Sequence, residues 1–439
     1  MERYLKIEHS PKLHGETTLI GAKNAVLVAM ASTILTDGKS VLSNVPHSDD
    51  VVQMMQLLNE LGAETSFDRE KHILEIDTTS LKGFQVKKEI MKKMRASVLV
   101  MGPLLARFGK ADIALPGGCV IGTRPINYHL YNLRKLGATI KIEGEYLFAH
   151  APKLYPTRLV LEYPSVGTTE NCVMAALGTH GTTTIINASL EPEVLDLIKI
   201  LQKMGAQILV EPPSTLVIEG GTPLKPITHP IMYDRLEAGS LLLAAAITGG
   251  SIHLPQANGH HLDVFLMKLE EMGHRIDLGK GGIGIRLKAA NSPKAVSFKT
   301  APYPGFPTDL QAPMMVAQCL ASGKSVIDET VFENRLLHVL ELQKMGAQIR
   351  VDGNRAIING VDELYGASVT AKDIRGGCAL LLAGLTAKGI TTMSGVHHLS
   401  RGYESIQKKL VDMGASIEYM DESLFTRRQE TGKCGQQWY

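Results

Sequence analysis

A three-residue phrase that recurs six times along the chain limits the possible folds more than any other feature. Each copy is leucine or methionine, then glycine, and in five of the six cases alanine; the glycines are Gly62, Gly137, Gly205, Gly273, Gly346 and Gly414. They are 75, 68, 68, 73 and 68 residues apart. This period is too long for one helix pair of a solenoid, so each copy indicates a small α/β subdomain. Six such units most simply form two domains of three.

Each phrase closes an amphipathic helix. In the fourth copy, Leu262, Phe265, Leu266, Leu269 and Met272 share one helical face. The glycine then serves as the residue after the helix, where positive φ is common. A strand is predicted directly after it, most clearly at 139–142, 207–210 and 348–351.

A second marker occurs once in each unit. A helix rich in Ala, Leu and Val leads into a strand that begins with glycine; the predicted helices are 24–35, 96–108, 172–180, 238–248, 314–321 and 378–387. Because these helices are apolar nearly all round, we expect them to be buried. Each unit thus combines one buried and one amphipathic helix with several strands.

Composition excludes several classes of protein. Hydrophobic residues make up 44% and the net charge is +2, which predicts a globular chain with no strong field for nucleic acid or membrane. The densest basic run, 87–95, is interrupted by apolar residues and reads as a solvated helix face. The five cysteines form no CxxC pair, which favours a reducing, cytoplasmic setting. No metal-ligand spacing, signal peptide or membrane-length apolar run is predicted.

Polar residues occupy the starts of all six buried helices, where a core would not need them. They are Lys23, Asn24, Arg95, 165–169, 234–237, 307–309 and 373–376. Capping explains any one of them. Their recurrence, four times with a basic residue, favours helix N-termini that converge on an anionic ligand in a cleft between two domains.

The stretch from Gly109 to His129 has two interpretations. A strand at 111–115 is broken by 116–118, and Cys119 lies between glycines with Lys110 and Arg124 nearby. Nearby cations lower the pKa of a thiol. The stretch is therefore either a lid that carries a reactive or acid/base cysteine beside an anion-binding arginine, or a plain surface loop with a free thiol.

Longer motifs indicate a family. The chain contains, in order, 21–25, 94–97, 115–125, 304–309, 329–335 and 400–404. From residue 4 to 417 it closely resembles the enolpyruvyl transferases, and among them the UDP-N-acetylglucosamine 1-carboxyvinyltransferases of bacterial peptidoglycan synthesis. The resemblance implies an α/β fold of two similar inside-out α/β barrel domains, each of three βαβαββ repeats, with a ligand cleft between them. One domain would be 23–233 with the Cys119 loop, the other 1–22 with 234–420, and 421–439 a disordered tail.

The same resemblance implies a reaction. Members of this family move the enolpyruvyl group of phosphoenolpyruvate to the 3′-hydroxyl of UDP-N-acetylglucosamine, with release of phosphate, by addition and elimination through a tetrahedral ketal. This is the first committed step of peptidoglycan precursor synthesis, which cell shape and division require. The partners implied are these two small molecules, with no cofactor, metal, nucleic acid or membrane, and the location implied is the cytoplasm.

Residue roles follow from the matched motifs. Asp309 resembles the base for the sugar hydroxyl, and Cys119 the proton donor, the adduct site and the target of the epoxide antibiotic fosfomycin. Lys23 and Arg401 complete the catalytic set, and Asp373 lines the same cleft. The phosphoenolpyruvate contacts implied are Lys23, Asn24, Arg124, Arg335, Arg375 and Arg401. The UDP-N-acetylglucosamine contacts implied are Arg95, Arg124, Pro125, Ile126, Asn127, Tyr128, Tyr163, Pro164, Ser165, Val166, Asp309 and Val331.

Two positions depart from the family pattern, and two alternatives stay open. Asn127 stands where many relatives have Asp, and Tyr163 where some have Lys. A transferase acting on shikimate 3-phosphate is the nearest alternative, against which the cysteine loop and 123–125 argue. A non-catalytic UDP-sugar-binding protein is the other, against which Lys23, Cys119, Asp309 and Arg401 argue.

Overall fold

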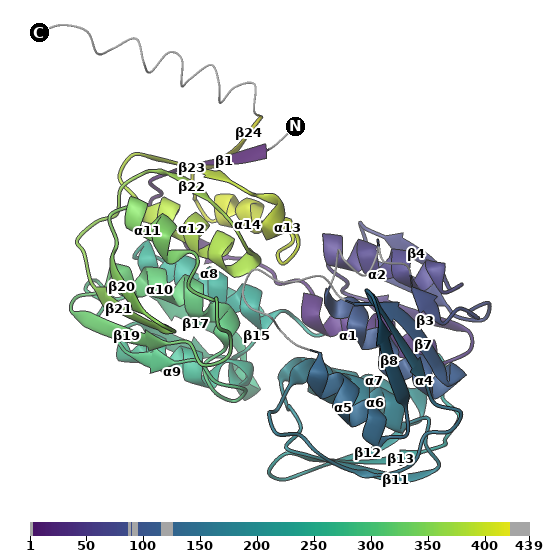
Figure 1. The fold of residues 1–439 in the computed structure, drawn as a ribbon. Helices are drawn as coiled ribbons and strands as arrows, with labels where there is room; N and C mark the ends of the chain where they lie inside the picture. Colours follow the sequence, from purple (N-terminus) through teal and green to yellow (C-terminus); the bar gives the residue numbers. More distant parts are fainter. Residues whose placement is uncertain (1–2, 87–88, 90–94, 116–125, 422–439) are drawn as a thin grey trace, which may run out of the picture. The chain divides into compact units, whose positions relative to one another are not determined.

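The computed structural model describes residues 3–86, 89, 95–115 and 126–421. The chain divides into two compact units (Figure 1). We call the described residues between 20 and 234 the central unit, and residues 3–19 together with 235–421 the terminal unit. Each unit has its own hydrophobic core.

The central unit holds three four-stranded sheets, ordered β14-β3-β5-β4, β6-β7-β9-β8 and β10-β11-β13-β12. Its strands are β3 (Lys39–Ser43), β4 (Glu64–Asp68), β5 (Ile73–Asp77), β6 (Gln85–Val86), β7 (Lys110–Ala114), β8 (Thr139–Glu143), β9 (Tyr146–His150), β10 (Arg158–Val160), β11 (Gly181–Ile186), β12 (Gln207–Glu211), β13 (Thr215–Gly220) and β14 (Thr228–Pro230). Its helices are α1 (Lys23–Ser32), η1 (Thr33–Leu35), α2 (Asp49–Glu60), η2 (Arg95–Val100), α4 (Met101–Phe108), α5 (Asn127–Lys135), α6 (Val166–Ala176) and α7 (Pro192–Met204).

The terminal unit repeats the plan with sheets β16-β17-β15-β2, β18-β19-β21-β20 and β22-β23-β1-β24. Its strands are β1 (Arg3–Glu8), β2 (His14–Glu16), β15 (Ser251–Asn258), β16 (Arg275–Leu278), β17 (Ile283–Lys288), β18 (Phe298–Lys299), β19 (Lys324–Asp328), β20 (Gln348–Asp352), β21 (Arg355–Asn359), β22 (Ser368–Thr370), β23 (Ile390–Ser394) and β24 (Ile417–Asp421). Its helices are α8 (Arg235–Ile247), η3 (Gly259–His261), α9 (Asp263–Glu271), η4 (Lys280–Gly282), η5 (Thr308–Leu310), α10 (Gln311–Cys319), α11 (Val339–Lys344), α12 (Ile374–Thr386), α13 (His397–Ser400) and α14 (Ile406–Asp412).

All six sheets share one topology. One outer pair of each sheet is parallel, as in β10 with β11 or β2 with β15, and the remaining pairs are antiparallel, as in β11 with β13 and β13 with β12. Three sheets include one strand from a distant part of the chain. β14 completes the sheet of β3, whereas β1 and β2 from the N-terminus complete the sheets of β23 and β15. Within the central unit, Gly21 pairs with Tyr233 in an antiparallel bridge.

The six repeated glycines adopt the predicted conformation. Their φ values are +98° at Gly62, +107° at Gly137, +112° at Gly205, +100° at Gly273, +93° at Gly346 and +108° at Gly414. The strand predicted after each of 137, 205 and 346 is present as β8, β12 and β20. The apolar face predicted for the fourth amphipathic helix is buried along α9.

The buried helices are present, but four begin earlier than predicted. α6, α8, α10 and α12 start at Val166, Arg235, Gln311 and Ile374, three to six residues before the apolar runs. Their first turns include buried polar side chains such as Thr168, Glu237 and Arg375. The apolar pattern misses these turns because hydrogen bonds and charge pairs, rather than hydrophobicity, offset their burial. The predicted helix at 96–108 is 3₁₀ over η2 and becomes α-helical only at Met101.

In the terminal unit, α8, α10 and α12 pack against one another and form the centre of the core. In the central unit, α4 packs against α6, and α6 also contacts η2 and α5. Asp421, which we assigned to a disordered tail, is instead the last residue of β24 and pairs with Arg3. The rest of that tail, 422–439, lies outside the described residues, as does most of the basic run at 87–95.

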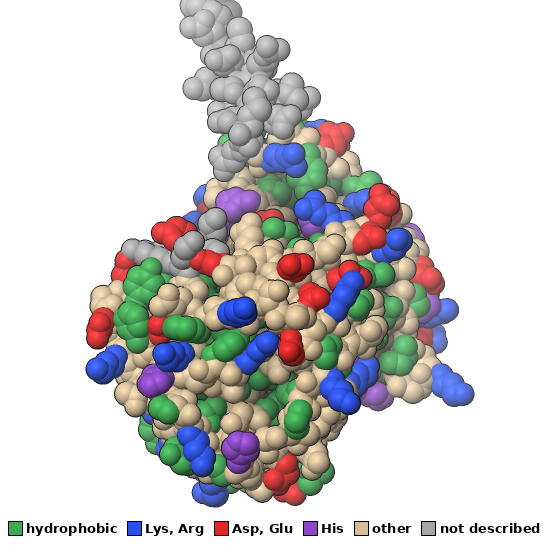
Figure 2. All heavy atoms as spheres, turned by 90° about the vertical axis from the view of Figure 1, so that its right-hand side faces the viewer, with side chains coloured by type: hydrophobic (Ala, Val, Ile, Leu, Met, Phe, Trp, Pro, Cys, Tyr) green, Lys and Arg blue, Asp and Glu red, His purple; other side chains and the backbone are tan. Residues whose placement is uncertain are grey.

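The surface carries both signs of charge. On the face drawn in Figure 2, Lys and Arg side chains are interspersed with Asp and Glu rather than gathered into one patch, in keeping with the net charge of +2. Over the described ranges, each helix is too short or too polar to cross a membrane.

Candidate functional site

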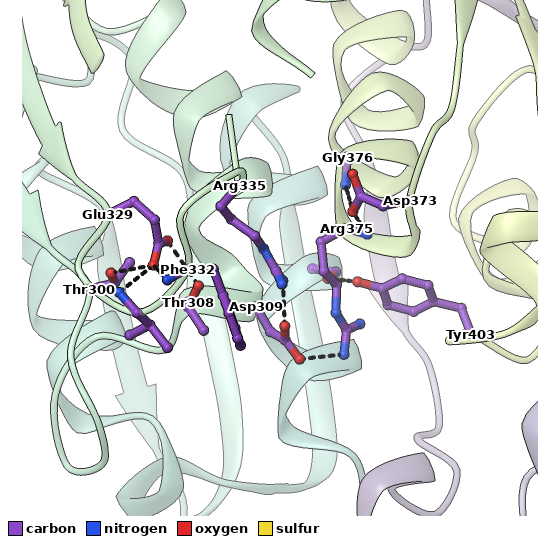
Figure 3. Close-up of polar contacts among 12 residues, drawn as sticks. Thr300, Thr308, Asp309, Glu329, Phe332, Arg335, Asp373, Arg375, Gly376 and Tyr403 are labelled. Carbon is purple, nitrogen blue, oxygen red and sulfur yellow. Dashed lines mark hydrogen bonds and ion pairs between the residues drawn. The ribbon is translucent and has the colours of Figure 1, made fainter. Parts of the chain in front are cut away.

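Asp309 is held between two arginines in the terminal unit (Figure 3). Arg335 Nη2 donates to Asp309 Oδ1 at 2.5 Å, and Arg375 Nη2 donates to Oδ2 at 3.0 Å. The arginine side chains are 3% and 6% exposed, whereas that of Asp309 is 24% exposed. Three predicted site residues from η5, the loop after β19 and α12 therefore meet in one cluster, whose carboxylate edge reaches solvent.

The two guanidinium groups control the charge of this carboxylate. Burial alone would raise the pKa of Asp309, but the charges and hydrogen bonds of Arg375 and Arg335 outweigh it and hold the pKa well below its usual range. Opposite charges this close favour the ionised form. Asp309 is therefore a carboxylate at any physiological pH and a weak base while both arginines remain on it.

Aromatic rings fix the arginines in place. The guanidinium carbon of Arg335 lies 5.3 Å from the centre of the Phe332 ring, and that of Arg375 lies 5.0 Å from the Tyr403 ring. Tyr403 is buried, and its hydroxyl hydrogen-bonds Ser240 Oγ of α8 at 2.9 Å. Cation–π contacts of this kind orient a planar guanidinium as well as stabilising it.

Glu329 ties together the segments that carry Asp309 and Arg335. Its carboxylate accepts from the hydroxyls of Thr300 at 2.9 Å and Thr308 at 2.8 Å. It also accepts from the backbone N–H groups of Val331 at 2.8 Å and Phe332 at 3.1 Å (Figure 3). Glu329 is 2% exposed, so these four bonds satisfy a buried charge. Val331, a predicted sugar-nucleotide contact, is thereby fixed relative to η5.

Asp373 and its surroundings border the cluster. Asp373 caps α12 by accepting from the N–H groups of Arg375 and Gly376, both at 2.9 Å. Burial lowers the pKa of His338 to about 4, with the charge of Asp373 opposing the shift and the charge of Arg335 reinforcing it. His338 is thus a neutral imidazole beside Arg335. Arg401 follows α13 and is half-buried; burial, then His397 and Arg401, lower the pKa of His398.

In the central unit, Lys23 begins α1 and has a partner that sequence reasoning missed. Its Nζ lies 3.0 Å from Oδ2 of Asp50, in the first turn of α2. The side chains are 13% and 4% exposed, so the pair is nearly enclosed. Asn24, the next residue, is exposed. The ion pair holds the Lys23 ammonium group in one position, although the lysine side chain is itself flexible.

Two helix starts carry the predicted sugar-nucleotide contacts of the central unit. Ile126 precedes α5, and Asn127 and Tyr128 form its first turn. Tyr163, Pro164 and Ser165 lead into α6, which begins at Val166, and Ser165 Oγ accepts from Thr168 N at 3.4 Å. All seven residues are partly or fully accessible to solvent, as a binding surface requires.

Several predicted residues lie outside what the structure describes. Cys119, Arg124 and Pro125 belong to the segment 116–125, and the side chain of Arg95 at the start of η2 is also outside the described set. The two interpretations of the Cys119 loop therefore both stay predictions. Within the described ranges, no group of three His, Cys, Asp or Glu side chains is arranged to hold a metal ion.

The residues that the sequence analysis missed are those that position the predicted site residues, not the site residues themselves. Asp50 and Ser240 are far from their partners along the chain, so no local spacing could have indicated them. Tyr403 lies in the motif 400–404, but its role depends on Ser240 and Arg375, which precede it by 163 and 28 residues. Glu329 lies in the motif 329–335, but its role depends on Thr300 and Thr308, which precede it by 29 and 21 residues.

Comparison with known proteins adds independent findings. The family model described as EPSP synthase (3-phosphoshikimate 1-carboxyvinyltransferase) matches residues 7–410. The chain is 46% identical to the UDP-N-acetylglucosamine 1-carboxyvinyltransferase of Geotalea uraniireducens, over 95% of this chain and 99% of that one. It is 45% identical to UDP-N-acetylglucosamine 1-carboxyvinyltransferase 1 of Caldanaerobacter subterraneus, over 95% and 99%.

Solved structures agree on the fold. The enolpyruvyl transferase NikO from Streptomyces tendae matches with a TM-score of 0.87 at 23% identity, over 95% of this chain and 99% of that one. EPSP synthase from Acinetobacter baumannii matches with a TM-score of 0.75 at 17% identity, over 95% and 100%. The predicted α/β fold of the enolpyruvyl transferases is confirmed.

Proposed function

The chain belongs to the EPSP synthase family of carboxyvinyltransferases, and from that premise we propose that it transfers the enolpyruvyl group of phosphoenolpyruvate to the 3′-hydroxyl of UDP-N-acetylglucosamine. The observation that carries the choice of acceptor is the 42–46% identity to enzymes with that name along nearly their whole length. The reaction would be the first committed step of peptidoglycan precursor synthesis. The partners would be these two small molecules, with neither nucleic acid nor membrane, in the cytoplasm.

The reaction needs two proton transfers for addition, a third for elimination, and a set of cations. In the addition step, the 3′-hydroxyl loses a proton, its oxygen bonds C2 of phosphoenolpyruvate, and C3 gains a proton to give a tetrahedral ketal. In the elimination step, C3 loses a proton, the bond from C2 to the phosphate oxygen breaks, and phosphate leaves. Asp309 is the group we assign to the hydroxyl proton, and Cys119 the group we assign to C3.

The arginine clamp limits when Asp309 can act. While Arg335 and Arg375 both donate to it, its oxygens are occupied and its pKa is low. A substrate phosphate or carboxylate competes for the same guanidinium donors, since arginine binds such anions in pairs of hydrogen bonds. Transfer of either arginine to the substrate would free one carboxylate oxygen and raise its proton affinity. We infer that phosphoenolpyruvate activates the base by taking an arginine from it.

The cations of the proposed site come from both units. Lys23, positioned by Asp50, would bind phosphoenolpyruvate together with Asn24 and Arg124, while Arg335, Arg375 and Arg401 come from the terminal unit. These five positive charges against the phosphate and carboxylate would stabilise the charge that develops on the leaving phosphate. No cofactor enters the proposal. The ligand cleft between the two domains stays a prediction.

The contacts proposed for UDP-N-acetylglucosamine are the starts of η2, α5 and α6, together with Asp309 and Val331. Glu329 supports this assignment because it locks the Val331 backbone to Thr308, next to the proposed base. The acceptor hydroxyl and the base would therefore keep a fixed separation. Asn127 and Tyr163 are the positions at which recognition of the sugar nucleotide would differ from that of relatives.

A phosphate-release assay tests the proposal. Purified protein with phosphoenolpyruvate should release phosphate when UDP-N-acetylglucosamine is added and not when shikimate 3-phosphate is added. Asp309→Ala should abolish release, whereas Asp328→Ala, which removes an exposed surface ion pair with Arg355, should not. Release with shikimate 3-phosphate would transfer the assignment to the other carboxyvinyltransferase class. Tight UDP-sugar binding without release would favour a binding protein.

A further inference from the structure

One buried side chain in the central unit joins three of the segments assigned to the sugar nucleotide. Asn171 lies in the second turn of α6 and is fully buried. Its Oδ1 accepts from Gly102 N at 2.7 Å, and its Nδ2 donates to Val98 O at 3.0 Å. Nδ2 also lies 2.9 Å from Nδ1 of His129 on α5. One amide thus bonds η2, α4 and α5 from α6.

The two backbone contacts fix which way round the amide lies. Gly102 N–H can only donate, so the atom facing it must be the amide oxygen. Val98 C=O can only accept, so the atom facing it must be the amide nitrogen. The orientation of Asn171 is therefore set by the backbone of η2 and α4 and not by the histidine.

This orientation dictates the state of His129. Because Nδ2 of Asn171 is a donor, the Nδ1 atom that it faces must be an acceptor without a proton. His129 is then a neutral imidazole with its proton on Nε2. It is 6% exposed, and a proton on Nδ1 would bring two donors together in a buried site.

The helix packing depends on the same contacts. A Cβ at position 102 would overlap the carbonyl oxygen of Asn171, so only glycine lets α4 approach α6 this closely. A Cβ at position 167 would lie 3.2 Å from Cε1 of His129, which places the ring directly over the first turn of α6. The ring therefore lies between α5 and the α6 start, the two segments that carry residues 126–128 and 163–166.

We propose that Asn171 and His129 are positioning residues that hold the η2, α5 and α6 segments in register to bind the sugar nucleotide. The proposal rests on the proposed function, because those segments matter only if they contact UDP-N-acetylglucosamine. Neither residue touches the reacting atoms. Loss of the contacts that Asn171 makes should weaken binding of the sugar nucleotide and leave phosphoenolpyruvate, assigned mainly to other residues, nearly unaffected.

Nitrogen NMR of the wild-type protein labelled with ¹⁵N-histidine tests the geometry without any activity. At pH 7 the His129 ring should show an unprotonated Nδ1 and a protonated Nε2. In Asn171→Asp, a carboxylate replaces the donor, so Nδ1 should acquire a proton and the ring signals should change state. A wild-type ring protonated on Nδ1 would overturn the proposed contact.

Substrate dependence tests the role. In Asn171→Leu, the KM for UDP-N-acetylglucosamine should rise about tenfold, equivalent to about 1.4 kcal/mol, while the KM for phosphoenolpyruvate changes less than about twofold. Asn132→Leu is the matched control: Asn132 is 2% exposed, and its amide nitrogen bonds Tyr128 O within α5 and, among the residues the structure describes, joins no second segment. This control should keep both KM values.

Three results would contradict the role or separate it from the proposed function. An unchanged KM for UDP-N-acetylglucosamine in folded Asn171→Leu would overturn it, as would an equal rise in Asn132→Leu. If Asn171→Leu does not fold, the same KM comparison is made on Asn171→Asp. A wild-type enzyme inactive towards UDP-N-acetylglucosamine would contradict the proposed function and the positioning role together, whereas the NMR result would still decide whether Asn171 fixes the His129 tautomer.

Discussion

At the residue scale, Asp309 links stability to catalysis. Its folded pKa is lowered, so the ion pairs with Arg375 and Arg335 contribute fully above the unfolded pKa of about 4 and are lost as pH falls through the folded value. Asp309→Asn leaves two buried guanidinium groups without their carboxylate. We expect its unfolding free energy at pH 7 to be lower by about 3–5 kcal/mol.

The pH dependence of that difference is the informative measurement. Chemical denaturation of wild type and Asp309→Asn should show a constant difference from pH 5 to 8 that shrinks below about pH 4. A difference that grows as the pH falls would mean that the carboxylate is protonated, not ionised, in the folded state.

Cysteine reactivity is a second property of single residues. Burial raises the pKa of Cys172 and of Cys319 to about 12, and burial also raises that of Cys378. These thiols should be inert at pH 7.5 because almost none is thiolate. We expect fosfomycin to inactivate the enzyme, faster with UDP-N-acetylglucosamine bound, and peptide mass mapping to find the adduct on Cys119 alone.

Cys119→Asp is the control for that experiment. A carboxyl can still deliver a proton but is a poor nucleophile towards the epoxide, so this variant should keep activity and resist the drug. Inactivation that persists in the variant, or an adduct on Cys434, would show that the role assigned to Cys119 is wrong.

Single site residues could be predicted where they lie in a recognisable sequence pattern. They could not be predicted where their role depends on a contact that forms only in the folded chain. Lys23, Asp309 and Arg335 lie in the family motifs and Arg375 in a polar helix start, and the structure brings the last three together. Asp50 and Asn171 were not identified, because an acid in a helix start and an amide in an apolar helix have ordinary local explanations. Their roles depend on partners 27 and 42 or more residues away.

At the scale of elements, Glu329 holds the loop between β19 and α11 through four hydrogen bonds. Glu329→Gln replaces one acceptor oxygen by a donor that faces hydroxyl and N–H groups. We expect a loss of about 1–3 kcal/mol in unfolding free energy and a raised KM for UDP-N-acetylglucosamine. Thr308→Val, which removes one of the four bonds, should have a smaller effect on both. Equal effects would mean that only the Thr308 bond matters.

The helix-ending glycines make a prediction that depends on backbone conformation alone. At Gly414 φ is +108°, and a Cβ added there would meet no atom within 4 Å, so space does not limit substitution. Gly414→Ala should still destabilise the protein by about 1 kcal/mol, because L-residues disfavour this region. Gly414→Asn should cost less in thermal or chemical denaturation. An alanine variant as stable as wild type would show that the turn relaxes to another conformation.

Elements were predictable where one force dominated. The amphipathic helices and the strands after them follow from hydrophobic periodicity and from glycine. The starts of α6, α8, α10 and α12 could not be predicted in this way, because their first turns bury polar groups. Glu237 in α8, for example, pairs with Lys409, which lies 172 residues away in the sequence. A pattern of apolar residues carries no information about such partners.

At the scale of the whole molecule, the repeat predicts the fold closely. Six phrases correspond to six sheets of one topology, three in each unit. The phrases alone do not indicate that β14, β1 and β2 complete sheets built mainly from distant strands, because the pattern within a strand does not show which distant strand it pairs with. The choice of acceptor within the family likewise depends on whole-chain identity and not on the fold, which NikO and EPSP synthase share.

The central claim is that this chain catalyses addition to phosphoenolpyruvate followed by elimination of phosphate, with UDP-N-acetylglucosamine as acceptor. The most direct measurement is mass spectrometry and proton NMR of the product formed in D₂O. Addition places a solvent deuteron on C3 and makes a methyl group, so elimination should leave deuterium in the vinyl group on the 3′-oxygen. An enolpyruvyl product with no deuterium, or no product from UDP-N-acetylglucosamine at all, would contradict the account.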